Sequence, residues 1–240
     1  MGLMLWLNLD LRTVFWVATI PACLAVFVLW VGVREPHQKI ERNNELYRNL
    51  PWHGGGALPP LFWAVVAVGT ALTMSRFSEA FLILRAQEAG LGLAYLPLAL
   101  VVMNVVYAAT AYPAGAMSDR TSPFWLLAAG CAVLLGADAA LAYGDDLAWS
   151  LGGVALWGLH MGLTQGVLAA LVAAAAPEAL RATAFGLFNL VTGLVAVAAS
   201  SLAGLLWQAF GSQATFAAGG VFAMLALFGI AALASMLKIR

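Results

Sequence analysis

The feature that constrains this chain most is a stretch of 56 residues, 182–237, that contains no acidic or basic side chain. As one straight helix it would be about 84 Å long, whereas a bilayer core needs a helix of only about 20 apolar residues. The stretch therefore has to fold back on itself. The Phe-Gly-Ser-Gln sequence at residues 210–213 is the polar, turn-like interruption near its middle.

Shorter stretches of the same kind precede it. They are uncharged or, in one case, interrupted only by Asp138, and they cover residues 13–33, 58–75, 89–118, 123–143 and 147–177. Charged residues make up 9% of the chain, whereas soluble domains carry about 25%. We therefore predict an all-α integral membrane protein with seven transmembrane helices.

Basic residues gather on one predicted side of the membrane. If the loop at 34–57 is cytoplasmic, alternation of the helices places a large excess of the Lys and Arg residues inside, as the positive-inside rule requires. The same assignment places the C-terminus inside and Asp145 and Asp146 outside. It also places the N-terminus outside, although the first residues lack the features of a signal peptide. We expect a multi-pass protein of the cell's inner membrane.

Composition and motifs argue against several other classes of protein. The formal net charge is zero, which argues against a nucleic-acid partner. Cys23 and Cys131 have no metal-like or disulfide-like spacing. No zinc-hydrolase, phosphate-loop or serine-nucleophile motif occurs. We therefore expect no enzyme, no metal and no cofactor, and an integral membrane enzyme is only a remote alternative.

The order of one helix, a polar loop and six helices resembles the last seven helices of a major facilitator superfamily transporter. The stretch AYPAGAMSDRTSP carries the most specific likeness, because Gly115, Asp119 and Arg120 match the first part of that family's Gly-x-x-x-Asp-Arg-x-Gly-Arg-Arg motif. The second part does not match, since Thr-Ser-Pro-Phe follows Arg120. The stretches SRFSEAFLILRA and RATAFGLFNLVTGL are also similar to the family's seventh and eleventh helices.

The resemblance implies a division of the chain into three parts. Residues 1–33 would be the sixth helix of such a transporter, residues 34–57 its cytoplasmic central loop, and residues 58–240 a six-helix half built from two inverted three-helix repeats. A short echo between Met-Asn-Val-Val at 103–106 and Phe-Asn-Leu-Val at 188–191 fits such a repeat. Helices one to five would be missing.

The resemblance also implies a function. The chain would belong to a secondary transporter that moves a small solute through the bilayer by alternating access, with proton coupling left open. The missing N-terminal half, or a second copy of the chain, would complete it. A truncated and inactive membrane protein, or a half-transporter subunit, remains an alternative.

Several polar residues within the apolar stretches are candidates for solute binding or proton coupling. Arg76 and Glu79 lie three residues apart, so on one helix they would share a face and could form a functional pair or a structural ion pair. His160 could bind solute or relay protons, and it could equally be packed between helices. Gln165 lies about one turn further on. Asn104 and Asn189 could contact solute or a neighbouring helix.

Other residues point to packing and gating. Gly158, Gly162 and Gly166 form a stripe typical of close helix packing, and we expect Gly115 to permit a close approach as well. Asp138 is expected to reach the outer interface.

We predict an ion pair at the cytoplasmic end of the bundle, in a gate motif that combines the matched residues with the next loop. The pair would join Arg120 to Glu178 or Asp119 to Arg181.

Overall fold

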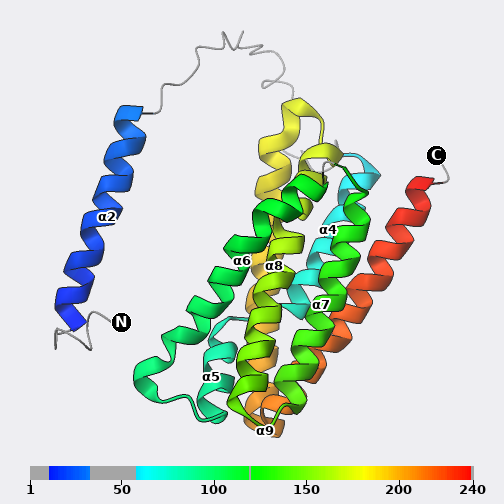
Figure 1. The fold of residues 1–240 in the computed structure, drawn as a ribbon. Coiled ribbons are helices and arrows are strands. Elements are labelled where there is room, and N and C mark those ends of the chain that lie inside the picture. Colours follow the sequence, from blue (N-terminus) through cyan, green and yellow to red (C-terminus); the bar gives the residue numbers. More distant parts are fainter. Residues whose placement is uncertain (1–10, 33–57, 119, 239–240) are drawn as a thin grey trace. The chain divides into compact units, whose positions relative to one another are not determined.

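The computed structural model describes residues 11–32, 58–118 and 120–238 (Figure 1). The chain divides into two compact units, residues 1–52 and residues 53–240. The ion pair predicted for Asp119 and the whole of the predicted central loop lie outside the described residues.

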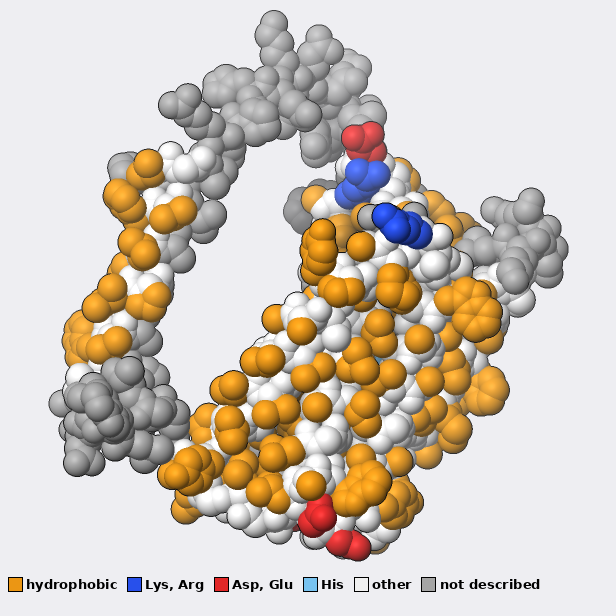
Figure 2. All heavy atoms as spheres, in the orientation of Figure 1, with side chains coloured by type: hydrophobic (Ala, Val, Ile, Leu, Met, Phe, Trp, Pro, Cys, Tyr) orange, Lys and Arg blue, Asp and Glu red, His pale blue; other side chains and the backbone are white. Residues whose placement is uncertain are grey.

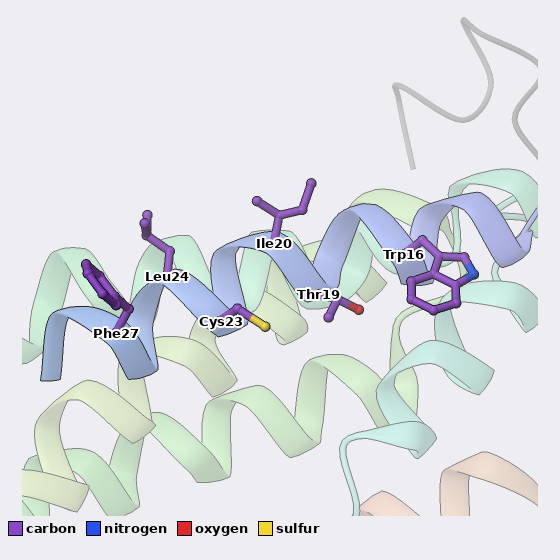
Figure 3. Close-up of a pocket in the computed structure, with 6 residues that line it drawn as sticks. All are labelled: Trp16, Thr19, Ile20, Cys23, Leu24 and Phe27. Carbon is purple, nitrogen blue, oxygen red and sulfur yellow. The ribbon is translucent and has the colours of Figure 1, made fainter. Parts of the chain in front are cut away.

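The first unit contains one described helix, α2 (Leu11–Gly32), with Pro21 inside it. Its described side chains are exposed. Six of them line a shallow hollow along one face of the helix (Figure 3): Trp16, Thr19, Ile20, Cys23, Leu24 and Phe27. None of these six side chains is charged, so this face suits a lipid or protein environment rather than water.

The second unit is a helical bundle. Its elements are α4 (Pro60–Ser75), α5 (Ala80–Glu88), η2 (Leu93–Tyr95), α6 (Pro97–Ser118), α7 (Pro123–Tyr143), α8 (Leu147–Ala175), η3 (Glu178–Leu180) and α9 (Arg181–Lys238). Within the described part of the chain, five segments are long and apolar enough to cross a membrane, and α2 contains a shorter apolar stretch, Thr19–Val28. The all-α membrane class predicted from the sequence is confirmed.

The fold-back predicted for the longest uncharged stretch occurs at Gly211. This residue has φ 82° and ψ −176°, outside the helical region, and glycine adopts a positive φ without a steric penalty. The break divides α9 into a first arm (residues 181–210) and a second arm (residues 212–238), which run in opposite directions (Figure 1). The hydroxyl of Thr215 bonds back across the turn, donating to the carbonyls of Gly211 at 3.1 Å and Ala203 at 3.4 Å.

Helix α8 packs along α6 and α7, and α9 packs along α4 and α7. The α6–α7 and α8–α9 connections lie at one end of the bundle, and the α7–α8 connection and the Gly211 turn lie at the other (Figure 1). Apolar side chains cover much of the visible flank between these ends, and the visible charged side chains are at the ends (Figure 2). This distribution is what a bilayer-spanning bundle requires.

Two of the three stripe glycines pack α8 tightly against α6. A Cβ atom on Gly158 would collide with the backbone of Met103, and one on Gly162 would collide with the Thr110 side chain. A Cβ atom on Gly166 would have no neighbour within 4 Å. The close packing predicted from the stripe is therefore confirmed for its first two members.

An aromatic cluster fills the end of the bundle near the Gly211 turn. Phe77 stands at its centre, with its ring centroid 5.3 Å from Phe81, 5.5 Å from Trp157 and 5.4 Å from Phe216. Such edge and tilted contacts add to the stabilisation from burial. The cluster joins the segment after α4 to α8 and to the second arm of α9.

Candidate functional site

The segment between α4 and α5 is an interruption of a membrane-spanning helix. Helix α4 ends at Ser75, and Arg76 has φ −114° and ψ 80°, away from helical values. The backbone groups released there find partners, since the Arg76 amide donates to the Thr73 carbonyl at 3.1 Å and the Ser78 amide donates to the Ser200 hydroxyl at 3.1 Å. Irregular backbone within a membrane domain is tolerated where it is buried in protein or lines a cavity.

Because of this interruption, two neighbouring side chains lie in different surroundings. Phe77 enters the aromatic cluster, and the half-buried Arg76 lines a cavity of about 310 Å³. The cavity is bounded by side chains of α4, α8 and the first arm of α9. Its lining consists of Thr73, Arg76, Gln165, Leu168, Ala169, Phe185, Phe188, Asn189 and Thr192.

Arg76 is the one charged residue in this lining, which contains no carboxylate. Its Nε atom is buried and has no hydrogen-bond partner among the described residues. Glu79 is near enough to Arg76 to interact with its charge, as are Cys131 and Tyr107, but no ion pair to Arg76 forms among the described residues. The cavity thus presents a positive charge that no carboxylate of the lining contacts.

The polar groups around Arg76 are oriented by bonds to the protein. The hydroxyls of Thr73 and Thr192 donate to the carbonyls one turn earlier in their own helices, each at 2.8 Å. The Oε1 atom of Gln165 accepts from the Tyr107 hydroxyl at 3.2 Å. The amide nitrogens of Gln165 and Asn189, together with the guanidinium, are therefore the groups in the lining that can donate to a solute.

The ion pair considered for Arg76 and Glu79 does not form. The two residues do not share a helix, because the chain is interrupted at 76–78, and Glu79 is exposed just before the first residue of α5. Glu79 does lie near enough to influence the charge of Arg76. Within the described residues, one ion pair is present, Arg85 to Glu88 at 3.7 Å, and it lies outside the cavity.

His160 lies inside the bundle rather than on the cavity wall. It is fully buried, and its Nδ1 atom is 2.8 Å from the Gly130 carbonyl of α7. Its Nε2 atom has no partner among the described residues. This geometry matches the packed histidine that the sequence offered as one of two interpretations.

The two asparagines of the internal echo lie in different surroundings. Asn189 lines the cavity, whereas the exposed Asn104 donates its amide to the Leu100 carbonyl of its own helix at 2.8 Å. Met103, beside Asn104, is buried under α8, and Phe188, beside Asn189, packs over Gly69 of α4. The echo does not place the two amides in equivalent contacts.

The predicted gate residues that the structure describes are at one end of the bundle, and the contact expected between Arg120 and Glu178 does not form. Arg120 and Glu178 are both exposed and form no ion pair. Arg181 donates through Nε to the Ala173 carbonyl at 3.3 Å. A Cβ atom on Gly115 would meet nothing within 4 Å, so this glycine does not allow a close approach within the bundle.

Asp138 lies in the core and not at an interface, contrary to the expectation from sequence. Its side chain is 2% exposed, and neither carboxylate oxygen has a hydrogen-bond partner among the described residues. It packs against Gly219 in the second arm of α9, where an added Cβ atom would lie 3.1 Å from Oδ2. Its position in the sequence, about one turn from the end of the uncharged stretch, gave no sign of this burial.

Sequence reasoning did not single out Thr73, Phe185 and Phe188 as cavity residues. A signal for them existed, because Thr73 is one turn before Arg76 and the lining residues of α9 lie at positions 185, 188, 189 and 192. That spacing of three, four and seven residues marks one face of a helix. In the described part of the chain, no group of three or more His, Cys, Asp or Glu side chains is arranged to hold a metal ion.

Comparisons with known proteins agree with this arrangement. A family model described as Major Facilitator Superfamily matches residues 1–200. An uncharacterized MFS-type transporter of Methanocaldococcus jannaschii is 29% identical over 227 residues, which cover 92% of this chain and 55% of that protein. The chain therefore spans about half the length of this curated relative.

A solved structure gives the same result for the fold. The crystal structure of the POT family transporter PepTSo matches 72% of this chain and 37% of its own, with a TM-score of 0.56 and 17% sequence identity. At this level of identity the likeness concerns the arrangement of helices alone. The resemblance identified from the sequence is confirmed by the family match.

Proposed function

The chain belongs to the Major Facilitator Superfamily, and we propose that its bundle is the C-terminal half of a secondary transporter that moves a small solute by alternating access. The observation that carries this proposal is the interrupted helix at Arg76 beside a cavity with polar donors. Interrupted membrane helices commonly form the solute sites of secondary transporters.

The proposal includes the architecture predicted from the sequence. Helix α2, the helices from α4 to α8 and the two arms of α9 would give seven spans, with α4 and α5 forming one span. The last six would form two inverted three-helix repeats. The half that faces the cavity would come from further sequence of the same protein, from a separate chain or from a second copy of this one.

The orientation follows from the distribution of charge at the two ends of the bundle. Arg120 and Arg181 would be cytoplasmic, and Asp145 and Asp146 would face outward. The motif residues Gly115, Asp119 and Arg120 would act at the cytoplasmic gate through contacts with the facing half. Arg120 has no ion-pair partner within the described bundle, which is compatible with such a role.

Single-cysteine labelling in sealed, oriented membrane vesicles tests this proposal. Cys23 and Cys131 are first replaced by Ala, and single cysteines are then introduced as Ser122→Cys, Asp145→Cys and Asn189→Cys. A membrane-impermeant maleimide should label the first from the cytoplasmic side only and the second from the outer side only. The cavity position should be labelled from either side, because alternating access exposes it to each in turn.

A matched control uses an exposed apolar position on the second arm of α9. Leu225→Cys should be labelled from neither side, because Leu225 is 55% exposed on a surface expected to face lipid. Labelling of Asn189→Cys from one side only would contradict alternating access, and labelling of Ser122→Cys and Asp145→Cys from the same side would contradict the topology. Proton coupling is tested separately, since equal solute uptake with and without a pH gradient would exclude it.

A further inference from the structure

The charge balance of the cavity points to the class of solute it takes. Arg76 lies within a membrane domain, where an ionised side chain without a partner is costly. A carboxylate in direct contact would normally offset such a cost. Glu79 is near enough to interact with the charge of Arg76, but it is exposed, is not part of the lining and forms no ion pair with Arg76. The partner of Arg76 is therefore expected to come from the solute.

The donors around Arg76 match an anion more closely than a cation. Arg76, Gln165 and Asn189 offer N–H groups, while the hydroxyl hydrogens of Thr73 and Thr192 are engaged by their own helices. A guanidinium presents two parallel N–H groups that fit the two oxygens of a carboxylate. An ammonium group would find no carboxylate in this lining, because Glu79 is not part of it.

The remaining wall of the cavity is apolar. Leu168, Ala169, Phe185 and Phe188 contribute it, and the ring of Phe188 is held over Gly69, where a Cβ atom would lie 2.5 Å from Cε2. The part of the cavity that the described residues line has a volume of about 310 Å³. A compact solute with one anionic group and one apolar face would satisfy both halves of the wall.

We propose that the cavity binds a small organic monocarboxylate, with its carboxylate on Arg76 and its apolar body against Leu168, Phe185 and Phe188. This inference rests on the proposed transport function and specifies the solute of the same site. Gln165 and Asn189 would add hydrogen bonds to the carboxylate. Inorganic oxyanions would contact Arg76 but not the apolar wall. Amides of the same shape would contact the apolar wall but would bring no negative charge to Arg76.

Binding to the purified full chain in lipid nanodiscs tests this inference without requiring transport. The probes are benzoate, its neutral counterpart benzamide, benzylamine and inorganic phosphate, measured by calorimetry and by thermal shift. Benzoate should bind about 10–100-fold more tightly than benzamide, as expected for a hydrogen bond to a charged group, and phosphate and benzylamine should bind more weakly than benzoate. Equal binding of benzoate and benzamide, tighter binding of phosphate, or no binding of benzoate would overturn the inference.

Variants locate the site. Arg76→Gln should weaken benzoate binding at least about tenfold, while Arg76→Lys should retain part of the affinity because it keeps the charge and loses the paired N–H geometry. Asn189→Ala should weaken binding several-fold, and the matched Asn104→Ala should not change it, because Asn104 is outside the cavity. Unchanged affinity in both Arg76→Gln and Asn189→Ala would place the binding elsewhere and overturn the inference.

Folding and function are separated by independent measurements. If Arg76→Gln does not fold, Arg76→Lys and Asn189→Ala still decide the matter, because neither removes a group bonded to another described residue. Labelling of Asn189→Cys from both sides without benzoate binding would leave the transport proposal intact and remove the solute class. Benzoate binding together with labelling of Asn189→Cys from one side only would support the solute class and contradict alternating access.

Discussion

Helix α8 contains two regions that use similar residues in different ways. Around Gly158 and Gly162 the helix touches α6 so closely that no side-chain atom could be added, and His160 between them is fully buried. One turn further on, Gln165 lines the cavity, while Gly166 is exposed outside the lining and a Cβ atom on it would meet nothing within 4 Å. The stripe of three glycines thus passes from a packed region into an open one.

The difference shows how one helix can serve stability and solute binding. Small residues let membrane helices approach closely, and the resulting dispersion contacts are a main source of stability where lipid is as apolar as the side chains. Further along, the same helix stays packed through Val167 and Val172, while Gln165, Leu168 and Ala169 line the cavity in which the proposed solute would bind. Substitutions should therefore affect folding in the first region and binding in the second.

The largest expected effect comes from adding volume to the packed region. Gly158→Ala would place a methyl group against the backbone of Met103, which cannot rotate away. We expect destabilisation of about 3 kcal/mol or more, or failure to fold, because overpacking against backbone has no inexpensive relaxation. The measurement is the yield of monodisperse protein together with its thermal midpoint in nanodiscs.

Gly166→Ala is the matched control, since it adds a methyl group to the same stripe in the open region. Its stability should stay within about 0.5 kcal/mol of the wild type. A similar loss in both variants would show that the stripe is packed along its whole length, by a surface outside the described bundle, and would remove the distinction between the two regions.

A smaller effect is expected for His160→Leu. The change removes the contact of Nδ1 with the Gly130 carbonyl from a fully buried site, and losing such a bond costs about 1–3 kcal/mol. Benzoate affinity should change less than about twofold, because His160 does not line the cavity. Thermal midpoint and calorimetric affinity are measured on the same preparation.

The opposite result would assign His160 a role in solute binding instead of packing. A tenfold loss of affinity with an unchanged thermal midpoint would mean that the imidazole acts on the solute, either directly or through Arg76. Tyr107→Phe supplies a comparison, because it removes the hydroxyl that bonds Gln165, a residue that does line the cavity. That variant should affect binding more than His160→Leu does.

The sequence predicted the features of this fold that depend on the composition of long stretches or on regular helical spacing. Uncharged stretches mark membrane-spanning segments because the cost of burying charge applies to every residue in them. The turn at Gly211 was predictable because a long helix had to reverse and a glycine in a polar group was available. The packing of Gly158 and Gly162 followed from a spacing that any helix imposes.

The interruption at residues 76–78 could not be predicted in the same way. No proline or glycine occurs there, and a continuous helix was the reasonable expectation for Arg76 and Glu79. The break is favoured by tertiary contacts, chiefly the burial of Phe77 among Trp157 and Phe216 and the bond from Ser78 to Ser200. These contacts join residues 80 to 139 positions apart, and a local sequence pattern does not reveal them.

The smallest expected effect concerns Asp138, a buried carboxyl group with no hydrogen-bond partner among the described residues. Both of its oxygens are buried and unbonded within the described residues, so the side chain contributes no hydrogen bond that a substitution could remove. Asp138→Asn keeps the shape and eliminates the possibility of an uncompensated charge, which is costly in an apolar interior. We therefore expect stability to rise slightly or to stay within about 1 kcal/mol of the wild type.

The measurement is the thermal midpoint in nanodiscs, with two carboxylates near the α7–α8 connection as references. Asp145→Asn removes an exposed charge and should have no effect, whereas Asp146→Ala should lower stability by about 1 kcal/mol, because Asp146 accepts the Trp149 amide at 2.8 Å and caps α8. A loss of more than about 2 kcal/mol in Asp138→Asn would mean that the carboxylate has a partner beyond the described residues. Asp138 would then belong to a second polar site, and the packed interior would no longer be purely structural.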